Sequence, residues 1–229
     1  MDEIACAVEA AWPFQDDTTI VIPYRQNNLK LFREMFLPEM YFRLKEENLL
    51  PLIFPGMNVY HLNDFICYMA KVRGFVIPCR KEGDQVQPAG LGWMAEVDGP
   101  IGARKGSFGF GFFDDMKHSR DRILQHVSLS FEMLDYWFTT FEIDQMFGSS
   151  LNPAAIRYSK HFGFSRPVVL PRFFNHNGSL IDASVISLER EVFKGYYSAW
   201  RSPSKARGYR YGRQRSQPAA NLDSEPVNV

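Results

Sequence analysis

Cysteine is scarce in this sequence of 229 residues, and its three copies, Cys6, Cys67 and Cys79, form no Cys-x-x-Cys pair. An odd number of widely spaced cysteines argues against a disulfide framework or a zinc site. It favours a reducing, cytoplasmic setting. Long apolar runs are missing too, since none approaches the roughly 18 residues that a transmembrane helix needs. The acidic first residues, Asp2 and Glu3, do not fit a signal peptide, so we expect neither export nor membrane insertion.

Short motifs of several enzyme classes are also absent. The sequence has no Walker loop, no dinucleotide-binding fingerprint, no serine-hydrolase elbow and no metal-ligand spacing. Gly-Phe-Gly at 109–111 is not a phosphate loop, because no strand-to-helix Gly-x-Gly-x-x-Gly pattern surrounds it. We therefore expect no metal and no nucleotide site of these kinds.

Net charge is zero overall but unevenly distributed. Six basic and two acidic residues from Arg201 onward give this segment +4, which leaves −4 for residues 1–200. An acidic body does not indicate a nucleic-acid-binding protein. We expect one folded domain over 1–200 and a flexible, basic Arg/Tyr/Ser-rich tail over 201–229. Tyr209 and Tyr211, flanked by arginines, are suited to stacking on single-stranded RNA; a solvated tail without function is the alternative.

Strand and helix patterns alternate along residues 1–200, which predicts an α/β fold with a mixed sheet. The expected strands are Thr18–Tyr24, Phe75–Arg80, Gln87–Val97, Arg104–Phe113, Phe141–Phe147, Phe164–Leu170 and Ser179–Leu188. The expected helices are Asn27–Asn48 (broken at Pro38), Leu62–Val72, Arg120–Phe138 and a short one within Asn152–Phe164.

The most informative stretch is Asn152–Phe164. Asn152 is a good N-cap and Pro153 suits the first helical position. Gly163 favours a left-handed C-terminal stop, after which Phe164 begins an extended run. This segment resembles the Asn-x-x-Ala…Gly-Phe segment of the GNAT N-acetyltransferase superfamily, and its Asn-Pro-Ala-x-Ile-Arg form is most similar to the branch that acetylates N-termini of ribosomal proteins. A generic amphipathic helix before a strand is the alternative.

The resemblance extends to the order of elements from Thr18 to Arg190 and to the final strand, with Asp182-Ala183 and Leu188-Glu189-Arg190. It implies a GNAT-like fold, in which helices flank a mixed, mainly antiparallel central sheet. It also implies an N-acyltransferase that uses acetyl-CoA or another acyl-CoA to modify an amine of a small molecule or a protein. The short body and glycine-poor loop loosely resemble divergent members encoded by bacteriophages.

The resemblance places acyl-CoA between the strands Arg104–Phe113 and Phe141–Phe147, which splay apart in this family. Backbone amides at Phe110, Gly111, Phe112 and Phe113 would pair with pantetheine, and the glycines favour a bulge there. The pyrophosphate would lie at the N-terminus of the Arg120 helix, where unpaired N–H groups attract anions. The nearby donors are Lys117, His118, Ser119, Arg120 and Arg122.

The pyrophosphate loop departs from the family pattern. The usual loop is Arg/Gln-x-x-Gly-x-Gly/Ala, whereas this chain has no glycine between Asp114 and Phe138. Asp114, Asp115 and Asp121 also add negative charge. A solvated charge cluster at a helix start is the alternative interpretation.

The family reaction is direct attack of an amine on the thioester, followed by protonation of the thiolate. By register the hydroxyl donor would be Ser159, and by chemistry Tyr158; the alternatives are a packed small residue and a surface residue. Asn152 would bind near the thioester, or serve only as the helix cap. For the general base, Glu142 on the strand beside the cleft is the first candidate, followed by Glu96 and His61, although each also suits a surface position.

A second hypothesis follows from these departures. The chain would be a catalytically weak or inactive GNAT-fold binding protein that engages a host or partner protein through its aromatic surface. Binding of acyl-CoA separates the two hypotheses.

Overall fold

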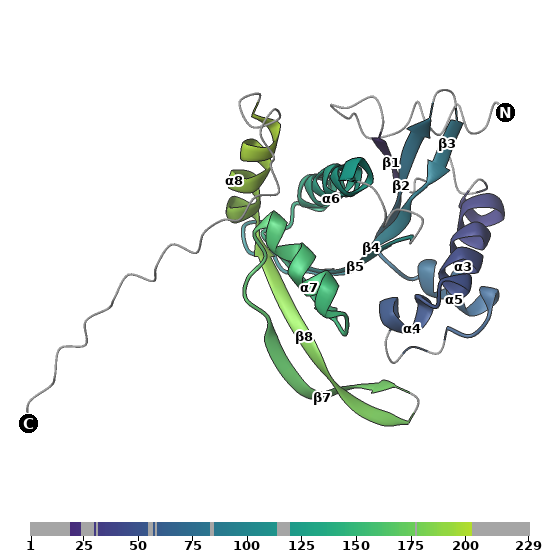
Figure 1. The fold of residues 1–229 in the computed structure, drawn as a ribbon. Coiled ribbons are helices and arrows are strands. Elements are labelled where there is room, and N and C mark those ends of the chain that lie inside the picture. Colours follow the sequence, from purple (N-terminus) through teal and green to yellow (C-terminus); the bar gives the residue numbers. More distant parts are fainter. Residues whose placement is uncertain are drawn as a thin grey trace, which may run out of the picture.

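The computed structural model describes residues 19–23, 30, 32–54, 57, 59–82, 85–113, 120–176 and 178–202. Its centre is an eight-stranded sheet with the order β1-β2-β4-β5-β6-β8-β7, and β3 pairs with β2 beside this path. Every neighbouring pair is antiparallel except β5 and β6, which are parallel. The predicted mixed, mainly antiparallel α/β sheet is therefore confirmed (Figure 1).

The strands are β1 (Thr19–Pro23), β2 (Gly74–Glu82), β3 (Gln85–Pro88), β4 (Gly90–Asp98), β5 (Lys105–Phe112), β6 (Gln145–Ser150), β7 (Val168–His176) and β8 (Ser179–Glu189). The helices are the π-helix η2 (Phe32–Phe36), α3 (Leu37–Glu46), α4 (Leu50–Ile53), α5 (Leu62–Met69), α6 (Arg120–Thr140), α7 (Pro153–Ser159), the 3₁₀ turn η4 (Lys160–Phe162) and α8 (Arg190–Arg201).

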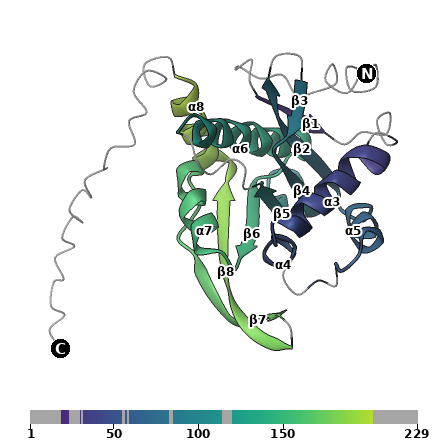
Figure 2. The ribbon, with the colours of Figure 1, turned by 45° about the vertical axis from the view of Figure 1, so that its right-hand side comes forward.

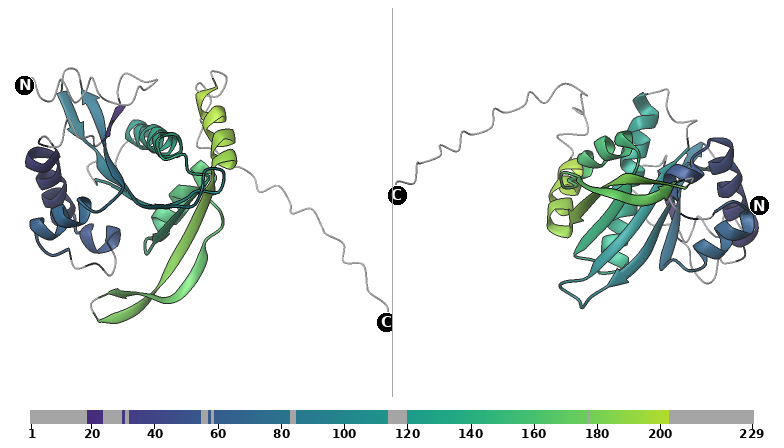
Figure 3. Two further views of the ribbon diagram at one scale, coloured as in Figure 1. Left: turned by 180° about the vertical axis from the view of Figure 1, so that it is seen from behind. Right: turned by 90° about the horizontal axis from the view of Figure 1, so that it is seen from below.

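Helices cover both faces of the sheet, as Figures 2 and 3 show. Helices α6, α7 and α8 pack on one face around a core that includes Trp137 and Phe108. The segment from η2 to α5 packs on the other face around a core that includes Phe54 and Trp93. Each large apolar side chain buried in these cores contributes about 1.5–3 kcal/mol, so both layers hold the sheet from which the candidate site is built.

Two sequence predictions need correction in position. The strand predicted at Phe141–Phe147 begins only at Gln145, because Phe141–Asp144 form a turn with Glu142 at φ +51°. Arg104 stabilises this turn, since its N–H donates to the Asp144 carboxylate at 2.8 Å and its guanidinium donates to the Phe141 carbonyl at 3.0 Å. The bulge predicted in Arg104–Phe113 lies on the neighbouring strand instead, between Met94 and Glu96 of β4.

Other predictions hold. Within the helix expected over Asn27–Asn48, the π-helix η2 leads directly into α3 at Leu37, so the change of helix type comes just before Pro38, which occupies the first turn of α3. Among the described residues, no helix is long and apolar enough to cross a membrane. Of the predicted tail, residues 203–229 lie outside the described part of the chain.

A buried carboxylate joins α8 to α6. Glu132 is 2% exposed, accepts a hydrogen bond from the Tyr197 hydroxyl at 2.9 Å, and lies 3.4 Å from the Arg201 guanidinium. Burial raises the pKa of Glu132, and the nearby Asp135 adds to the rise, whereas Tyr197 and Arg201 lower it. Burial thus outweighs the two partners, and the charged form of Glu132 is disfavoured in the folded protein.

This raised pKa predicts how stability depends on pH. The neutral Glu132 carboxyl stabilises the folded state most at pH values below the ordinary Glu pKa. This stabilisation is lost as pH rises through the raised pKa of the folded state. We therefore expect Glu132→Gln to be more stable than wild type at pH 8, with the difference shrinking toward pH 4, in urea unfolding experiments. The control is Glu191→Gln, which removes an exposed ion pair with Lys194 and should change the free energy of unfolding by less than about 1 kcal/mol at either pH. A Glu132→Gln variant destabilised equally at both pH values would contradict this assignment.

Candidate functional site

The main irregularity of the sheet is the short contact between β5 and β6. Only three pairs join them, Lys105 with Gln145, Gly106 with Met146, and Ser107 with Phe147. Beyond the last pair β5 continues to Phe112 and β6 to Ser150, with no ladder between them. The two strands therefore enclose a wedge that is closed at the Lys105 end and open at the Phe112 end (Figure 2).

Gly148 lies just beyond the last β5–β6 pair, and its lack of a side chain leaves room where the wedge begins. A Cβ atom at Gly148 would lie only 3.0 Å from the Phe108 ring, which packs at this level of the sheet. Backbone N–H and C=O groups need hydrogen-bond partners. Beyond Ser107, the backbone groups of β5 that point toward β6 have no ladder partner in the described part of β6. An extended ligand can therefore pair with these groups.

Three aromatic side chains of β5 line one face of the wedge. The rings of Phe108, Phe110 and Phe112 follow one another at centroid distances of 5.9 and 5.8 Å. Trp137, near the end of α6, contacts Phe108 at 5.7 Å, while His126, in its second turn, stacks on Phe112 at 4.4 Å. Helix α6 therefore runs antiparallel to β5, and its N-terminus lies at the open end of the wedge.

The predicted pyrophosphate donors are only partly visible. Lys117, His118 and Ser119 lie outside the described residues, and Arg120 and Arg122 are described only as helix backbone. The structure thus places the helix N-terminus beside the wedge, and the roles of these five side chains stay predictions. Phe110, Gly111 and Phe112 lie on the open half of β5, and Phe113 directly follows it, buried in the opposite core beneath the Arg43 guanidinium at 3.9 Å.

Helix α7 has the capped form that the sequence predicts. The Asn152 side-chain oxygen accepts a hydrogen bond from the Ala154 N–H at 2.9 Å, and Pro153 opens the helix. Gly163 ends the following turn at φ +90°, where only glycine is free of strain. The Asn152 oxygen is therefore used for the cap, whatever further contact its amide group makes.

The two candidate hydroxyl groups of α7 differ sharply in placement. Ser159 is 2% exposed, and its hydroxyl donates to the Ile156 carbonyl at 2.8 Å within the same helix. Tyr158 instead shares a 2.9 Å hydrogen bond with Ser130 of α6, and its ring lies 6.5 Å from that of Phe110 on the open half of β5. The structure thus places the Tyr158 ring near Phe110 of the wedge, and it commits the Ser159 hydroxyl to the backbone of its own helix.

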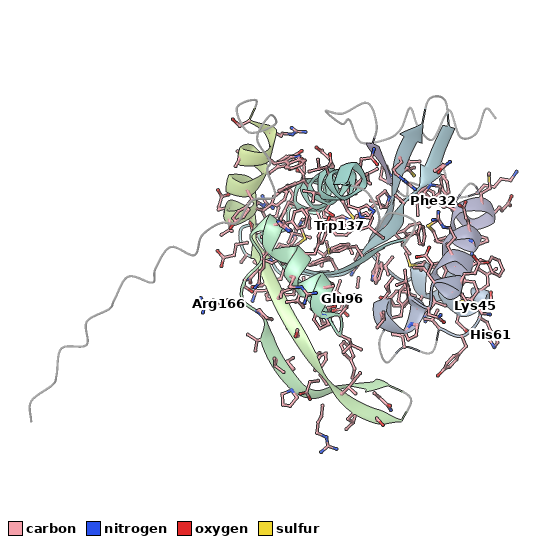
Figure 4. All side chains as sticks on the ribbon, in the orientation of Figure 1. Phe32, Lys45, His61, Glu96, Trp137 and Arg166 are labelled. Atoms are coloured by element: carbon pink, nitrogen blue, oxygen red, sulfur yellow. The ribbon has the colours of Figure 1, made fainter. Side chains whose placement is uncertain are left out.

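The sequence prediction gave the wrong position for Glu142, the first candidate for the general base. Glu142 is not on a strand beside the cleft but in the turn before β6, at the closed end of the wedge. Its side chain is 56% exposed and pairs with Arg104 at 3.3 Å. His61 lies at the outer side of the N-terminal helices, whereas Glu96 lies near the middle of the sheet (Figure 4). Of the three carboxylate and imidazole candidates, only Glu96 is near the wedge.

One hollow lined by described residues lies elsewhere. It is at the closed end of the wedge, where Arg104, Asp144 and Arg190 line it. These charges already pair, Arg104 with Glu142 at 3.3 Å and Arg190 with Asp144 at 3.8 Å. Because Arg104, Asp144 and Arg190 are engaged in these ion pairs, we assign no ligand to the hollow and place the candidate site at the open end.

Neither a protein-family model nor a curated protein matches this sequence. Solved structures do match. A GCN5-related N-acetyltransferase from Brucella melitensis aligns with a TM-score of 0.59 at 14% identity, covering 84% of this chain and 86% of its own. The ribosomal-protein-S5-alanine acetyltransferase from Vibrio fischeri aligns with a TM-score of 0.57 at 11% identity, covering 80% and 98%. The chain has the GNAT fold.

A third GNAT structure is informative about ligands. The spermidine N-acetyltransferase from Vibrio cholerae, in complex with CoA and spermine, aligns with a TM-score of 0.57 at 14% identity, covering 78% of this chain and 99% of its own. At such identity the likeness establishes the GNAT fold of this chain and leaves its activity to be tested.

Two contributors to the site were not foreseen from the sequence. Ser130 lies in the long α6 helix and meets Tyr158 only through packing of the helices, so no local pattern marks it. Trp93 covers the glycine face of β5: a Cβ atom at Gly109 would lie 2.2 Å from its indole ring. In the sequence, the two glycines of Gly-Phe-Gly at 109–111 were the signal that another group packs closely against this strand.

The Trp93 contact predicts an effect of substitution on stability. Trp93 is 4% exposed and stacks on Phe54 at 4.8 Å, so it has little room to move. We expect Gly109→Ala to lower the free energy of unfolding by about 1–3 kcal/mol through overpacking. Gly195→Ala in α8, where nothing lies within 4 Å of the added Cβ, should instead raise it by about 0.5–1 kcal/mol. Urea unfolding of both variants measures this; equal effects would contradict the packing described.

Proposed function

We propose that this protein is an acyl-CoA-dependent N-acyltransferase, acetyl-CoA being the first candidate donor. The observation that carries the proposal is the wedge between β5 and β6, whose open end lies beside the N-terminus of α6. An extended pantetheine arm can pair with strand backbone there, while the pyrophosphate meets unpaired helix N–H groups. The GNAT fold of the chain supports this use of the wedge.

The predicted CoA contacts fit this arrangement. The backbone of Phe110–Phe113 follows the last β5–β6 pair and is the segment that pantetheine would contact. Lys117, His118, Ser119, Arg120 and Arg122 would surround the pyrophosphate, as proposed from the sequence. The three aspartates of this loop oppose an anion, so we expect weaker CoA binding than a glycine-rich loop gives.

Tyr158 is the proposed proton donor to the departing thiolate. Its hydroxyl lies on the wedge side of α7 and is oriented by Ser130 at 2.9 Å. Asn152, the N-cap of the same helix, would hold the pantetheine or thioester with the amide group that its cap leaves available. Ser159 has no part in this proposal, because its hydroxyl is committed to the helix backbone.

The acceptor that we propose is a primary amine. Structures of similar fold are named for spermidine and for an alanine of ribosomal protein S5, and the Asn-Pro-Ala-x-Ile-Arg form of α7 is most similar to the ribosomal-protein branch. We therefore propose a small-molecule amine or a protein N-terminus. The cytoplasmic setting, the bacteriophage likeness and RNA contact through the tail stay predictions from the sequence.

One observation favours a second candidate, a GNAT-fold protein that binds a partner protein without efficient turnover. The β7–β8 hairpin carries large exposed apolar side chains, with exposed fractions of 62% for Val168, 58% for Val169 and 52% for Phe173. Exposed apolar groups that gather on one element are typical of protein-binding surfaces. Together with the aspartates of the loop, they make this the alternative if no acyl-CoA binds.

Binding of acetyl-CoA is the first test. At 100 times its dissociation constant a ligand of the folded state adds about 2.7 kcal/mol of stability, which corresponds to a shift of about 5–10 °C in Tm for a chain of this size. We expect this shift in a thermal unfolding experiment with acetyl-CoA and with CoA, and none with ATP. No shift with any acyl-CoA would reject the transferase proposal and favour the partner-binding candidate.

The placement of the two hydroxyl groups gives a matched pair of variants. We expect Tyr158→Phe to lower kcat by about 10²–10⁴-fold, the usual contribution of a positioned acid, with little change in KM for acetyl-CoA. Ser159→Ala removes a hydroxyl that faces its own helix, so its kcat should stay close to that of wild type. Release of free thiol in the presence of amines measures both, and a larger loss in Ser159→Ala than in Tyr158→Phe would reverse the assignment.

A further inference from the structure

One segment of the folded body contains no acidic residue. Residues 145–181 include no Asp or Glu, and they carry four fixed positive charges, on Arg157, Lys160, Arg166 and Arg172. Because residues 1–200 carry −4 in total, the rest of them carry −8. The charge of the folded body is therefore divided between a cationic segment and an acidic remainder.

The fold gathers this segment at one end of the sheet. Residues 145–181 form β6, α7, η4 and β7, and they end three residues into β8. The strands β6, β8 and β7 close the strand order on this side, and α7 packs against β6. Figures 1 and 2 show α7 and the β7–β8 hairpin together at this end, opposite to α3, α4 and α5. We call residues 145–181 the cationic flank.

All four cations of the flank are exposed. Arg157 and Lys160 are three residues apart, which places them on one outer face of the helical segment. Arg166 lies beside the start of β7 (Figure 4), and Arg172 lies where the β7–β8 register shifts. Among the described residues, none of these four side chains forms an ion pair or a hydrogen bond. Their charges are therefore available to an external anion.

The other titratable groups at this end change the balance little. Asp182 of β8 accepts a hydrogen bond from the backbone N–H of Arg172 at 2.9 Å, and counting it with the flank still leaves +3. Glu189 pairs with Gln145 at the closed end of the wedge, beyond the part of β8 that pairs with β7. Burial lowers the pKa of His161, so this side chain adds no fixed charge at neutral pH. The flank therefore presents a net positive charge to solvent.

The β7–β8 hairpin adds an exposed aromatic ring to these charges. Phe173 directly follows Arg172 and is 52% exposed. It belongs to the irregular part of β7, and its ring meets that of Phe174 edge-on at a centroid distance of 4.9 Å. A ring that has a neighbour on one side and solvent on the other is suited to stacking on a planar base. Cations beside an exposed aromatic ring are the combination that single-stranded nucleic acids recognise.

We propose that the cationic flank and Phe173 form a binding surface for single-stranded nucleic acid. The four cations contact phosphates along the strand, and Phe173 stacks on one base. Charge complementarity favours this occupant over an uncharged protein surface, which would leave four cations without a counter-charge. An acidic peptide would supply the charge but no base for Phe173. This inference goes beyond acyl transfer and does not depend on it.

The test measures fluorescence anisotropy of a labelled oligouridylate of about 12 nucleotides with the full chain and without acyl-CoA. We expect a dissociation constant of about 1–100 µM at physiological salt. The logarithm of the association constant should fall with the logarithm of salt concentration at a slope of about −3, since each phosphate contact on a single strand contributes about −0.7. An oligothymidylate of equal length shows whether RNA or DNA binds more tightly. If neither binds at low salt, the proposal fails.

A pair of double variants tests the charges. Arg157→Gln with Lys160→Gln should weaken binding by about 10-fold and make the salt slope shallower by about 1.4, the share of two phosphate contacts. Lys71→Gln with Arg73→Gln is the matched control, because it removes two exposed cations from the turn between α5 and β2. The control should keep the wild-type affinity and slope. Equal losses in both double variants would overturn the proposal, since net charge alone would then explain binding.

A pair of single variants tests the stacking. Phe173→Ala should weaken binding by about 5- to 150-fold, the effect of losing one stacked base, and leave the salt slope unchanged. Phe42→Ala is the matched control, because the Phe42 ring on α3 is 51% exposed. It should bind as wild type does. If Phe173→Ala also binds as wild type does, or if polyglutamate displaces the probe as well as unlabelled oligouridylate does, the surface is not specific for nucleic acid and the proposal is wrong.

The basic tail is a competing source of affinity and needs its own variant. In this full-length variant Gln replaces the five cations that follow the last described residue, which are Lys205, Arg207, Arg210, Arg213 and Arg215. We expect it to bind the oligouridylate still, and to lose affinity further when Arg157→Gln and Lys160→Gln are added. Complete loss of binding in the tail variant, with wild-type binding in Arg157→Gln with Lys160→Gln, would assign the activity to the tail and overturn the inference.

Discussion

The parallel contact between β5 and β6 is the constraint on which the rest of the structure depends. Antiparallel strands flank this contact on both sides, so it is where the two halves of the sheet meet. The contact lasts for three residue pairs and then ends. Strand backbone left without a neighbour must find hydrogen bonds in water or in a ligand. A wedge in the middle of a sheet therefore leaves strand backbone that an extended, amide-containing molecule would be able to pair with.

The layers around the wedge give its two faces different roles. Helices α6 and α7 close one face with aromatic rings and bring the Tyr158 hydroxyl to it. On the other face α4 contacts Gly111 and α5 contacts Trp93, whereas Glu96 is exposed. A donor held from the helical face and an amine arriving from the exposed face would meet at the wedge without competing for space.

Much of the fold was predictable because its signals are local. Asn152, Pro153 and Gly163 each have a conformational role within a few residues, and the structure confirms the first two at the start of α7 and the third at the end of η4. The α/β class followed from the alternation of strand and helix patterns. The strand predicted at Phe141–Phe147 was displaced because Arg104, nearly 40 residues away, holds the preceding turn, and no local pattern contains that contact.

The site was less predictable because its residues are placed by tertiary packing. Counting along the helix pointed to Ser159, yet a rotation of one residue decides which hydroxyl faces the wedge. Glu142 was expected beside the cleft, and the shift of β6 puts it at the opposite end. The position of Glu96 depends on one extra residue in β4, which alternation of side chains along a strand does not reveal.

Amide hydrogen exchange with and without acetyl-CoA tests the central claim most directly, because it reads the backbone of the wedge itself. The account predicts slower exchange from Gly109 to Phe113 and in the first turn of α6 when acetyl-CoA is present, with no change in the β7–β8 hairpin. Unchanged exchange in β5, or protection confined to the hollow beside Arg104 and Arg190, would show that the wedge does not take the donor.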